Sequence, residues 1–185
     1  MLTLFSVPRP FVGHYGIIQR NAIKSWTMLR PLPEIILLGT DEGTAEVAEE
    51  FGVRHVPGID YGDSNSPRLD SMHREVEREA QNALLCIVNA DIILMNDFMR
   101  AVERVSQRSR KFLMMGQRHN LDVRSPMGFG PNWIAELRSQ VEETGSLGAR
   151  TGEDYIVFPK DFFGYIPPLD VGHSYTDGWL LYEGR

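Results

Sequence analysis

Two polar residues that could bind a metal ion, Asn89 and Asp91, follow directly after an apolar run at residues 83–88. A short run rich in branched side chains predicts a strand buried on both faces of a parallel sheet. Ligands of open α/β sheets bind at the carboxyl ends of such strands, where an unpaired carboxylate is costly unless it binds a cation. Asp91 is therefore a candidate ligand for Mg²⁺ or Mn²⁺ carrying a diphosphate. The alternative is an Asp that only forms a turn or a helix N-cap.

The composition is typical of an ordinary globular domain with an acidic balance. The chain has 185 residues, of which 42% are hydrophobic and 24% charged, and its formal net charge is −6. One domain is the simplest organisation at this length. The acidic balance argues against general nucleic-acid binding and means that an anionic substrate would need a local cation. The single cysteine, Cys86, cannot form an internal disulfide and is expected to be a small core residue.

No segment suggests a membrane span or a secretory leader. The apolar runs stay well short of the roughly 20 residues that a membrane-spanning helix needs. The N-terminus has no basic lead and too short an apolar stretch for a signal peptide. We therefore expect a cytoplasmic protein without a transmembrane segment, and the sequence leaves its oligomeric state open.

The order of the elements predicts an α/β fold. The pattern alternates strands and helices from the start, which favours parallel strands joined by right-handed crossovers. Ser66 and Pro67 are expected to begin the third helix as N-cap and first residue, and Asn96 is expected to cap the fourth. The expected strands are 2–7, 34–39, 53–56, 83–88, 112–116 and 155–158, and the expected helices are 15–28, 44–51, from 66, 97–107, 131–143 and within 172–182.

The predicted architecture is a single Rossmann-like domain over residues 1–185, with a mostly parallel sheet and helices on both faces. The regular first half, about residues 1–95, is expected to bind a nucleotide. The less regular second half, about residues 96–185, is expected to hold the acceptor and the catalytic groups. Such a division is common around one cleft, although fold alone does not fix function.

Five segments carry a resemblance to a known family: residues 4–8, 36–43, 85–94, 152–159 and 175–180. Together they span nearly the whole chain, and the layout resembles the nucleotide-diphospho-sugar transferases, which are glycosyltransferases of A-type fold, near the inverting family-2-like enzymes. The resemblance implies metal-dependent transfer of a sugar from a nucleotide-diphosphate donor to a hydroxyl acceptor, with inversion at the sugar carbon.

The resemblance also implies roles for single residues. In that family an Asp-any-Asp motif ends the fourth strand and holds the metal. Asn89 replaces the first Asp, so it would bond a ribose or a metal-bound water, and Asp91 would contact the metal. The Asn89→Asp substitution, which restores the family pattern, is expected to be tolerated and to tighten metal binding. The family places a catalytic base at the start of a late helix, which corresponds to Asp177, with Asp154 as the rival. His173 is a further metal ligand, a diphosphate contact or a polar loop residue.

Contacts to the nucleotide are expected where the first two strands end and at the start of the third helix. The strand ends would meet the base and ribose, and a basic residue at a helix N-terminus would meet phosphate. The candidates are Ser6, Pro8, Arg9, Asp41, Glu42, Arg68 and, from the metal strand, Asn89.

Two other functions remain open. A sugar nucleotidyltransferase needs a Gly-rich, basic loop directly after the first strand, whereas residues 8–13 contain a single Arg and a single Gly. A non-catalytic binder of nucleotide sugars is compatible with Asn89 and with the small size of the chain. A serine hydrolase has no support, because the sequence contains no Gly-any-Ser-any-Gly elbow. Hydrolysis or transfer of a nucleotide sugar would separate an enzyme from a binder.

Overall fold

The computed structural model describes residues 1–63, 65–149, 154–172 and 174–183, with only the backbone described at 174–177 and 181. Its helices are α1 (Gly13–Thr27), α2 (Thr44–Phe51), α3 (Leu69–Glu79), α4 (Asn96–Arg108), α5 (Trp133–Thr144) and α6 (Ser174–Glu183). Its strands are β1 (Leu2–Ser6), β2 (Glu34–Leu38), β3 (Arg54–Val56), β4 (Leu84–Val88), β5 (Met114–Met115), β6 (His119–Asn120), β7 (Ser146–Leu147) and β8 (Tyr155–Pro159).

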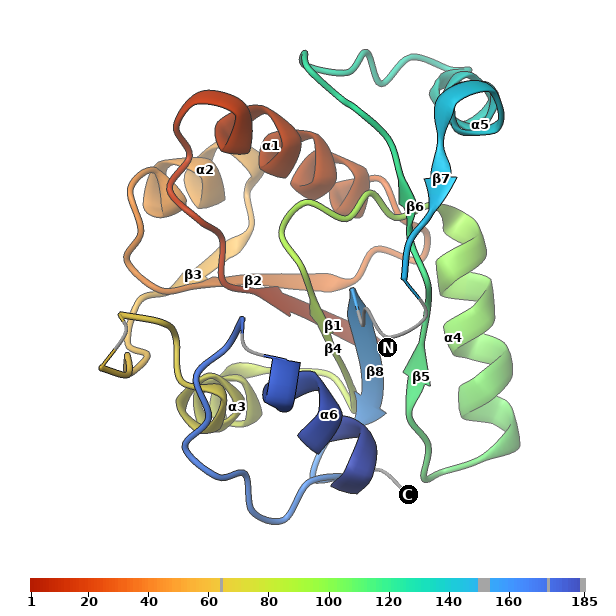
Figure 1. The fold of residues 1–185 in the computed structure, drawn as a ribbon. Helices are drawn as coiled ribbons and strands as arrows, with labels where there is room; N and C mark the ends of the chain where they lie inside the picture. The colour runs from red at the N-terminus through yellow and green to blue at the C-terminus, as the bar shows by residue number, and fades with distance from the viewer. Residues whose placement is uncertain (64, 150–153, 173, 184–185) are drawn as a thin grey trace.

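The main sheet has six strands in the order β3-β2-β1-β4-β8-β5 (Figure 1). The first four strands of the chain are parallel to one another. The second half of the chain joins the same sheet through β8, which runs antiparallel to both β4 and β5. The predicted α/β fold with a mostly parallel sheet is therefore confirmed.

Two apolar cores cover the two faces of this sheet. Successive residues of β1 alternate between them, so that Leu4 packs in the first core and Phe5 in the second. Residues of α1, α2 and α4 complete the first core, and residues of α3 and α6 complete the second. Figure 1 shows α1 and α2 on the opposite side of the sheet from α3 and α6. Helices on both faces match the prediction, and they leave the carboxyl ends of the strands open to the loops.

Two predicted helix starts are wrong. Helix α3 begins at Leu69 with Arg68 at its N-cap, not at Ser66 and Pro67, because isolated bridges pair Pro67 with Tyr61 and Arg68 with Asp170. These pairings hold the backbone extended beyond the position where local capping signals would start a helix. Helix α4 begins at Asn96 itself, and the Asn96 side-chain oxygen accepts from the backbone N–H of Arg30 at 2.8 Å.

The segment between β5 and β8 contains the predicted fifth helix, α5, and two short strands. Its ends pair as a small two-stranded sheet of β6 and β7, which the sequence pattern did not predict. Helix α5 stands beyond this pair, away from the main sheet (Figure 1). Among the described residues, none of the helices combines the length and the apolar character needed to cross a membrane.

Candidate functional site

The turn after β4 presents Asp91 outward. The backbone N–H of Ile92 donates to the Asn89 carbonyl at 3.1 Å and closes the turn. Within the turn, Ala90 is buried at 7% exposure, whereas Asp91 is exposed. Helix α1 anchors the turn, because the Trp26 indole N–H donates to the Ile92 carbonyl at 2.8 Å. In the described part of the chain, no hydrogen bond or ion pair engages the Asp91 carboxylate. Asp91 therefore has the position that the sequence predicts for a ligand.

Asp154 reaches the same place from a distant part of the sequence. Because β8 runs antiparallel to β4, the residue before β8 lies at the carboxyl end of β4, where the Asn89 N–H donates to the Asp154 carbonyl at 2.9 Å. The Asp154 side chain is 96% buried and forms an ion pair with Arg118, and the Asn89 amide donates to the same oxygen at 3.4 Å. A carboxylate this buried needs such partners.

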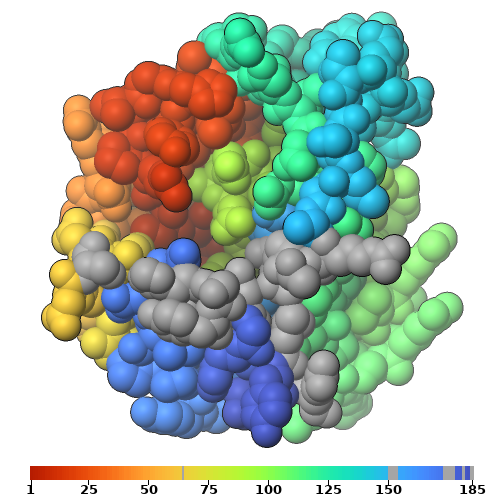
Figure 2. All heavy atoms as spheres, viewed as in Figure 1, coloured from red at the N-terminus to blue at the C-terminus, as the bar shows by residue number. Residues whose placement is uncertain are grey.

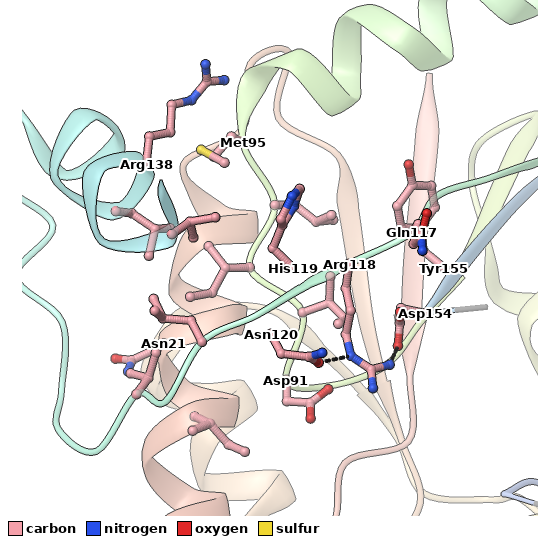
Figure 3. A pocket seen from close by; sticks show the side chains of 18 of the residues that line it. Asn21, Asp91, Met95, Gln117, Arg118, His119, Asn120, Arg138, Asp154 and Tyr155 are labelled. Carbon is pink, nitrogen blue, oxygen red and sulfur yellow. Dashed lines mark hydrogen bonds and ion pairs between the residues drawn. The ribbon is translucent and has the colours of Figure 1, made fainter. Parts of the chain in front are cut away.

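Arg118 connects this carboxylate to the β5–β8 segment. Its Nε donates to the Asn120 side-chain oxygen at 2.7 Å, while its Nη1 meets Asp154. Figure 3 shows the guanidinium between Asn120 and Asp154, with the Asp91 carboxylate nearby. The four side chains form a polar cluster, called here the Asp91 cluster: Asp91, Arg118, Asn120 and Asp154.

The Asp91 cluster forms one end of a cavity of about 640 Å³. The walls come from the start of α1, the β4–α4 connection, the β5–β6 segment, α5 and the start of β8. In Figure 2 a hollow separates the red N-terminal segment from the cyan second half, with the yellow-green end of β4 at its floor. A volume of this size is typical of small-ligand sites, which hold about 300–1,000 Å³.

The residues at this edge suit a magnesium or manganese ion that arrives with a substrate. No group of three His, Cys, Asp or Glu side chains gathers as a metal site in the described ranges, and His173, the second predicted ligand, lies outside them. Mg²⁺ needs no such group, because it commonly binds one or two carboxylates, several waters and substrate phosphates. The Asp91 carboxylate, without a partner among the described side chains, and the exposed Asn89 side chain fit that donor set.

The predicted nucleotide contacts after β1 are held in place by hydrogen bonds. The buried Ser6 hydroxyl donates to the Val88 carbonyl at 2.6 Å and so joins the ends of β1 and β4. The Gln19 amide holds the backbone of Arg9 with two hydrogen bonds of 2.8 Å. Pro8 is buried, and the exposed Arg9 guanidinium lies over the Tyr15 ring at 5.0 Å from its centroid.

The other predicted contacts lie on neighbouring loops. Asp41 is half-buried and Glu42 exposed after β2, and the Glu42 carbonyl accepts from Phe11 N–H at 2.8 Å. Arg68 pairs with Asp70 at 3.1 Å, and this hydrogen bond raises the pKa of the Arg68 guanidinium. Their contacts to a nucleotide remain predictions.

The two candidate bases differ in what the structure describes of them. The backbone of Asp177 lies in the first turn of α6, so the predicted position at the start of a late helix is confirmed, while its side chain lies outside the described part. Asp154 is described, and Arg118 and Asn89 already occupy one of its oxygens.

Sequence reasoning gave no role to Arg118 and Asn120. Their only signal is a polar run, Arg118, His119 and Asn120, which begins shortly after the apolar residues 112–115. Such a run is typical of any exposed loop. Only the pairing of β8 with β4 shows that it meets Asp154.

No protein-family model matches the sequence, and no curated protein matches it either. Solved structures are similar in fold. The 4-diphosphocytidyl-2C-methyl-D-erythritol synthase of Anaerococcus prevotii superposes with a TM-score of 0.52 at 10% identity, covering 98% of this chain and 82% of that one. A CMP:2-keto-3-deoxy-manno-octonic acid synthetase complexed with CTP gives 0.55 at 8% identity, covering 99% and 85%.

The chain shares the α/β fold of these two structures. The broad resemblance in fold that the sequence predicts is therefore confirmed. At such low identities the similarity shows the fold alone. The narrower resemblance to inverting glycosyltransferases stays a prediction.

Proposed function

We propose that this protein is a glycosyltransferase that moves a sugar from a nucleotide-diphosphate donor to a hydroxyl acceptor, using Mn²⁺ or Mg²⁺. The observation that carries the proposal is the Asp91 carboxylate at the carboxyl end of β4, which no described residue engages, beside a cavity of about 640 Å³. Open α/β sheets bind their ligands at this edge. A bound divalent cation would supply positive charge that stabilises the departing diphosphate.

The chain's own residues then divide into holding and reacting groups. Asp91, with Asn89, would hold the cation, and His173 is a further candidate ligand. The nucleoside would lie over the ends of β1 and β2, and Arg68 would meet phosphate. Ser6, Pro8, Arg9, Asp41 and Glu42 are the residues proposed to contact the nucleoside.

We assign the role of base to Asp177 ahead of Asp154. A base must hold its lone pairs free to take the proton from the acceptor hydroxyl. Asp154 is 96% buried and accepts from Arg118 and Asn89, which suits a carboxylate that positions Arg118. If Asp177 is the base, Asp177→Asn keeps donor binding and loses transfer, while Asp154→Asn keeps measurable transfer. The reverse ranking would give the role to Asp154.

Nucleotidyl transfer is the second candidate, and the similar structures favour it. Both are named as synthases of cytidylyl compounds, and one contains CTP. The loop after β1 argues the other way, because a triphosphate cradle needs free backbone N–H groups. Pro8 and Pro10 have none, and the N–H groups of Arg9, Phe11 and Val12 donate to Gln19, Glu42 and Pro10.

Two assays with one matched pair of variants test the proposal. The purified protein is incubated with Mn²⁺ and each common nucleotide sugar, and separately with CTP and sugar phosphates, and nucleoside diphosphate and pyrophosphate are measured. Release of nucleoside diphosphate that Asp91→Asn abolishes and Asp97→Asn retains is the expected result. Asp97 is a suitable control because it lines the same cavity but pairs with Arg138 at 2.7 Å.

The other outcomes contradict the proposal in different ways. Pyrophosphate release from CTP would establish nucleotidyl transfer. Tight binding of a nucleotide sugar without turnover under any condition would indicate a non-catalytic binder. Metal-dependent binding that is unchanged in Asp91→Asn would remove Asp91 from the metal site.

A further inference from the structure

The cavity beside Asp91 has an apolar end opposite the Asp91 cluster. Five half-buried apolar side chains line it: Ile18, Met95, Leu121, Val123 and Val141. They come from α1, the β4–α4 connection, the segment after β6 and α5. Helix α5 thus contributes to a wall although it lies away from the sheet (Figure 1).

These five side chains belong to neither apolar core of the described structure. They lie outside the two clusters that cover the faces of the sheet, and each contributes apolar surface to the lining of the cavity. Apolar surface that lines a space of this size is typical of a site for an apolar ligand group.

The two ends of the cavity differ in polarity. Figure 3 places Asp91 and Asp154 toward one end, and Met95 and Arg138 toward the other, near α5. Arg138 pairs with Asp97 at 2.7 Å, so its charge is already matched. A ligand that fits both ends has a polar head at the Asp91 cluster and an apolar body along Met95, Leu121 and Val141.

We infer that the acceptor is an amphiphile, in which a hydroxyl-bearing head group is joined to an apolar alkyl chain. The identification of this ligand as the acceptor rests on the proposed glycosyl transfer. Its binding does not, because the apolar end is formed without any contribution from the nucleotide. The head would lie beside Asp91, and the chain would run between α1 and α5.

Alkyl β-D-glucosides of four to seven carbons test the inference, with glucose as the reference, all below their micelle concentrations. Binding to the nucleotide-free protein is measured by calorimetry. We expect glucose to bind weakly and each added methylene to tighten binding by up to about fourfold, the factor that corresponds to about 0.8 kcal/mol per buried methylene. Affinity that is the same for every chain length would overturn the inference.

Three variants of α5 locate the binding. Val141→Asn puts an amide on the apolar wall and should abolish the dependence on chain length. Val141→Trp fills the space with an apolar ring, so it should weaken heptyl glucoside, whereas adsorption to an apolar surface would strengthen it. Ile134→Asn is the matched control, because Ile134 is half-buried on the same helix but does not line the cavity. Equal losses in Val141→Asn and Ile134→Asn would overturn the inference.

The failure of this inference can be told from the failure of the proposed function. Chain-length-dependent binding without consumption of any nucleotide sugar would keep the apolar site and reject glycosyl transfer. Transfer to glucose and heptyl glucoside with the same KM would keep glycosyl transfer and reject the amphiphilic acceptor.

Discussion

The two sides of the Asp91 turn are built differently. On the side of β1 and β2, Phe11 N–H donates to the Glu42 carbonyl at 2.8 Å, and Gln19 holds Arg9 with two hydrogen bonds. On the side of β8 and β5, β6 and β7 share two residue pairs, and α5 buries only Trp133 and Leu137. Neither of these two residues belongs to a core cluster of the described structure.

This difference predicts how each side behaves when a ligand binds. A segment fixed by backbone hydrogen bonds and a shared core keeps its geometry, whereas a segment with few buried contacts opens at low free energy. We expect the side of β1 and β2 to be preset and the β5–β8 segment to adjust to its ligand. Substitutions should therefore cost more stability on the first side than on the second.

The largest effect is expected at Trp26, which joins the preset side to Asp91. Its side chain is fully buried in the first core, and its indole N–H donates to the Ile92 carbonyl. Trp26→Ala should lower the free energy of unfolding by about 3–5 kcal/mol, as measured by guanidinium denaturation. Trp26→Phe keeps most of the packing and should cost less. A Trp26→Ala variant as stable as the wild type would refute the anchoring role of α1.

The next effect compares two glutamines, one on each side. Gln19 is 2% exposed and satisfies both the N–H and the carbonyl of Arg9. Gln117 is exposed, and its amide donates to the Gly148 carbonyl. Gln19→Leu should cost about 2 kcal/mol because it orphans two partly buried backbone groups, while Gln117→Leu should stay within about 0.5 kcal/mol. Equal costs in denaturation experiments would remove the contrast between the sides.

Local pattern was enough to predict the preset side. Its strands and helices have clear periodicity and short connections, which predict parallel strands and place Asp91 at their carboxyl ends. The wrong start of α3 shows the limit of that approach. Ser66 and Pro67 carry the local signal of a helix start, but bridges to Tyr61 and Asp170 hold the backbone extended. A contact 102 residues along the chain leaves no trace in local pattern.

The Asp91 cluster could be predicted only in part for the same reason. Asp91 follows its strand directly, whereas Asp154 lies 65 residues beyond Asn89, and Arg118 lies 36 residues before Asp154. Their meeting depends on the antiparallel direction of β8, which an apolar run of five residues does not reveal. In the sequence, Asp154 and Asp177 are therefore similar candidates for the catalytic base. Only the hydrogen bonds that Asp154 accepts from Asn89 and Arg118 distinguish the two.

A smaller effect is expected at Leu137, the buried leucine of α5. It is 5% exposed but borders the cavity and lies outside both described cores. Because the site can relax into the cavity, Leu137→Ala should cost about 1–2 kcal/mol, below the range of about 2–5 kcal/mol expected for Leu37→Ala in the first core. Urea denaturation of both variants measures the difference. A cost at Leu137 that equals the cost at Leu37 would show that α5 is part of a rigid core.

The smallest effect on stability is expected at Asn89, where the two sides meet. Its amide donates to Asp154 Oδ1 at 3.4 Å. The sequence alone predicts that Asn89→Asp is tolerated and that it tightens metal binding. The structure adds a cost, because the variant loses this donor and sets a second carboxylate against Asp154, while Arg118 on the same oxygen limits the repulsion. Without metal the variant should be less stable by about 1 kcal/mol, a typical value for one hydrogen bond.

A divalent cation should offset that cost, because a positive charge between two carboxylates favours their ionised forms. Mn²⁺ should therefore raise the thermal midpoint of Asn89→Asp by more than it raises that of the wild type. Asn89→Ser is the control, since it also removes the amide that donates to Asp154 but adds no charge. The decisive measurement is the Mn²⁺-induced shift in all three proteins. Equal shifts would mean that position 89 does not face the cation, and that Asp91 holds the cation without help from residue 89.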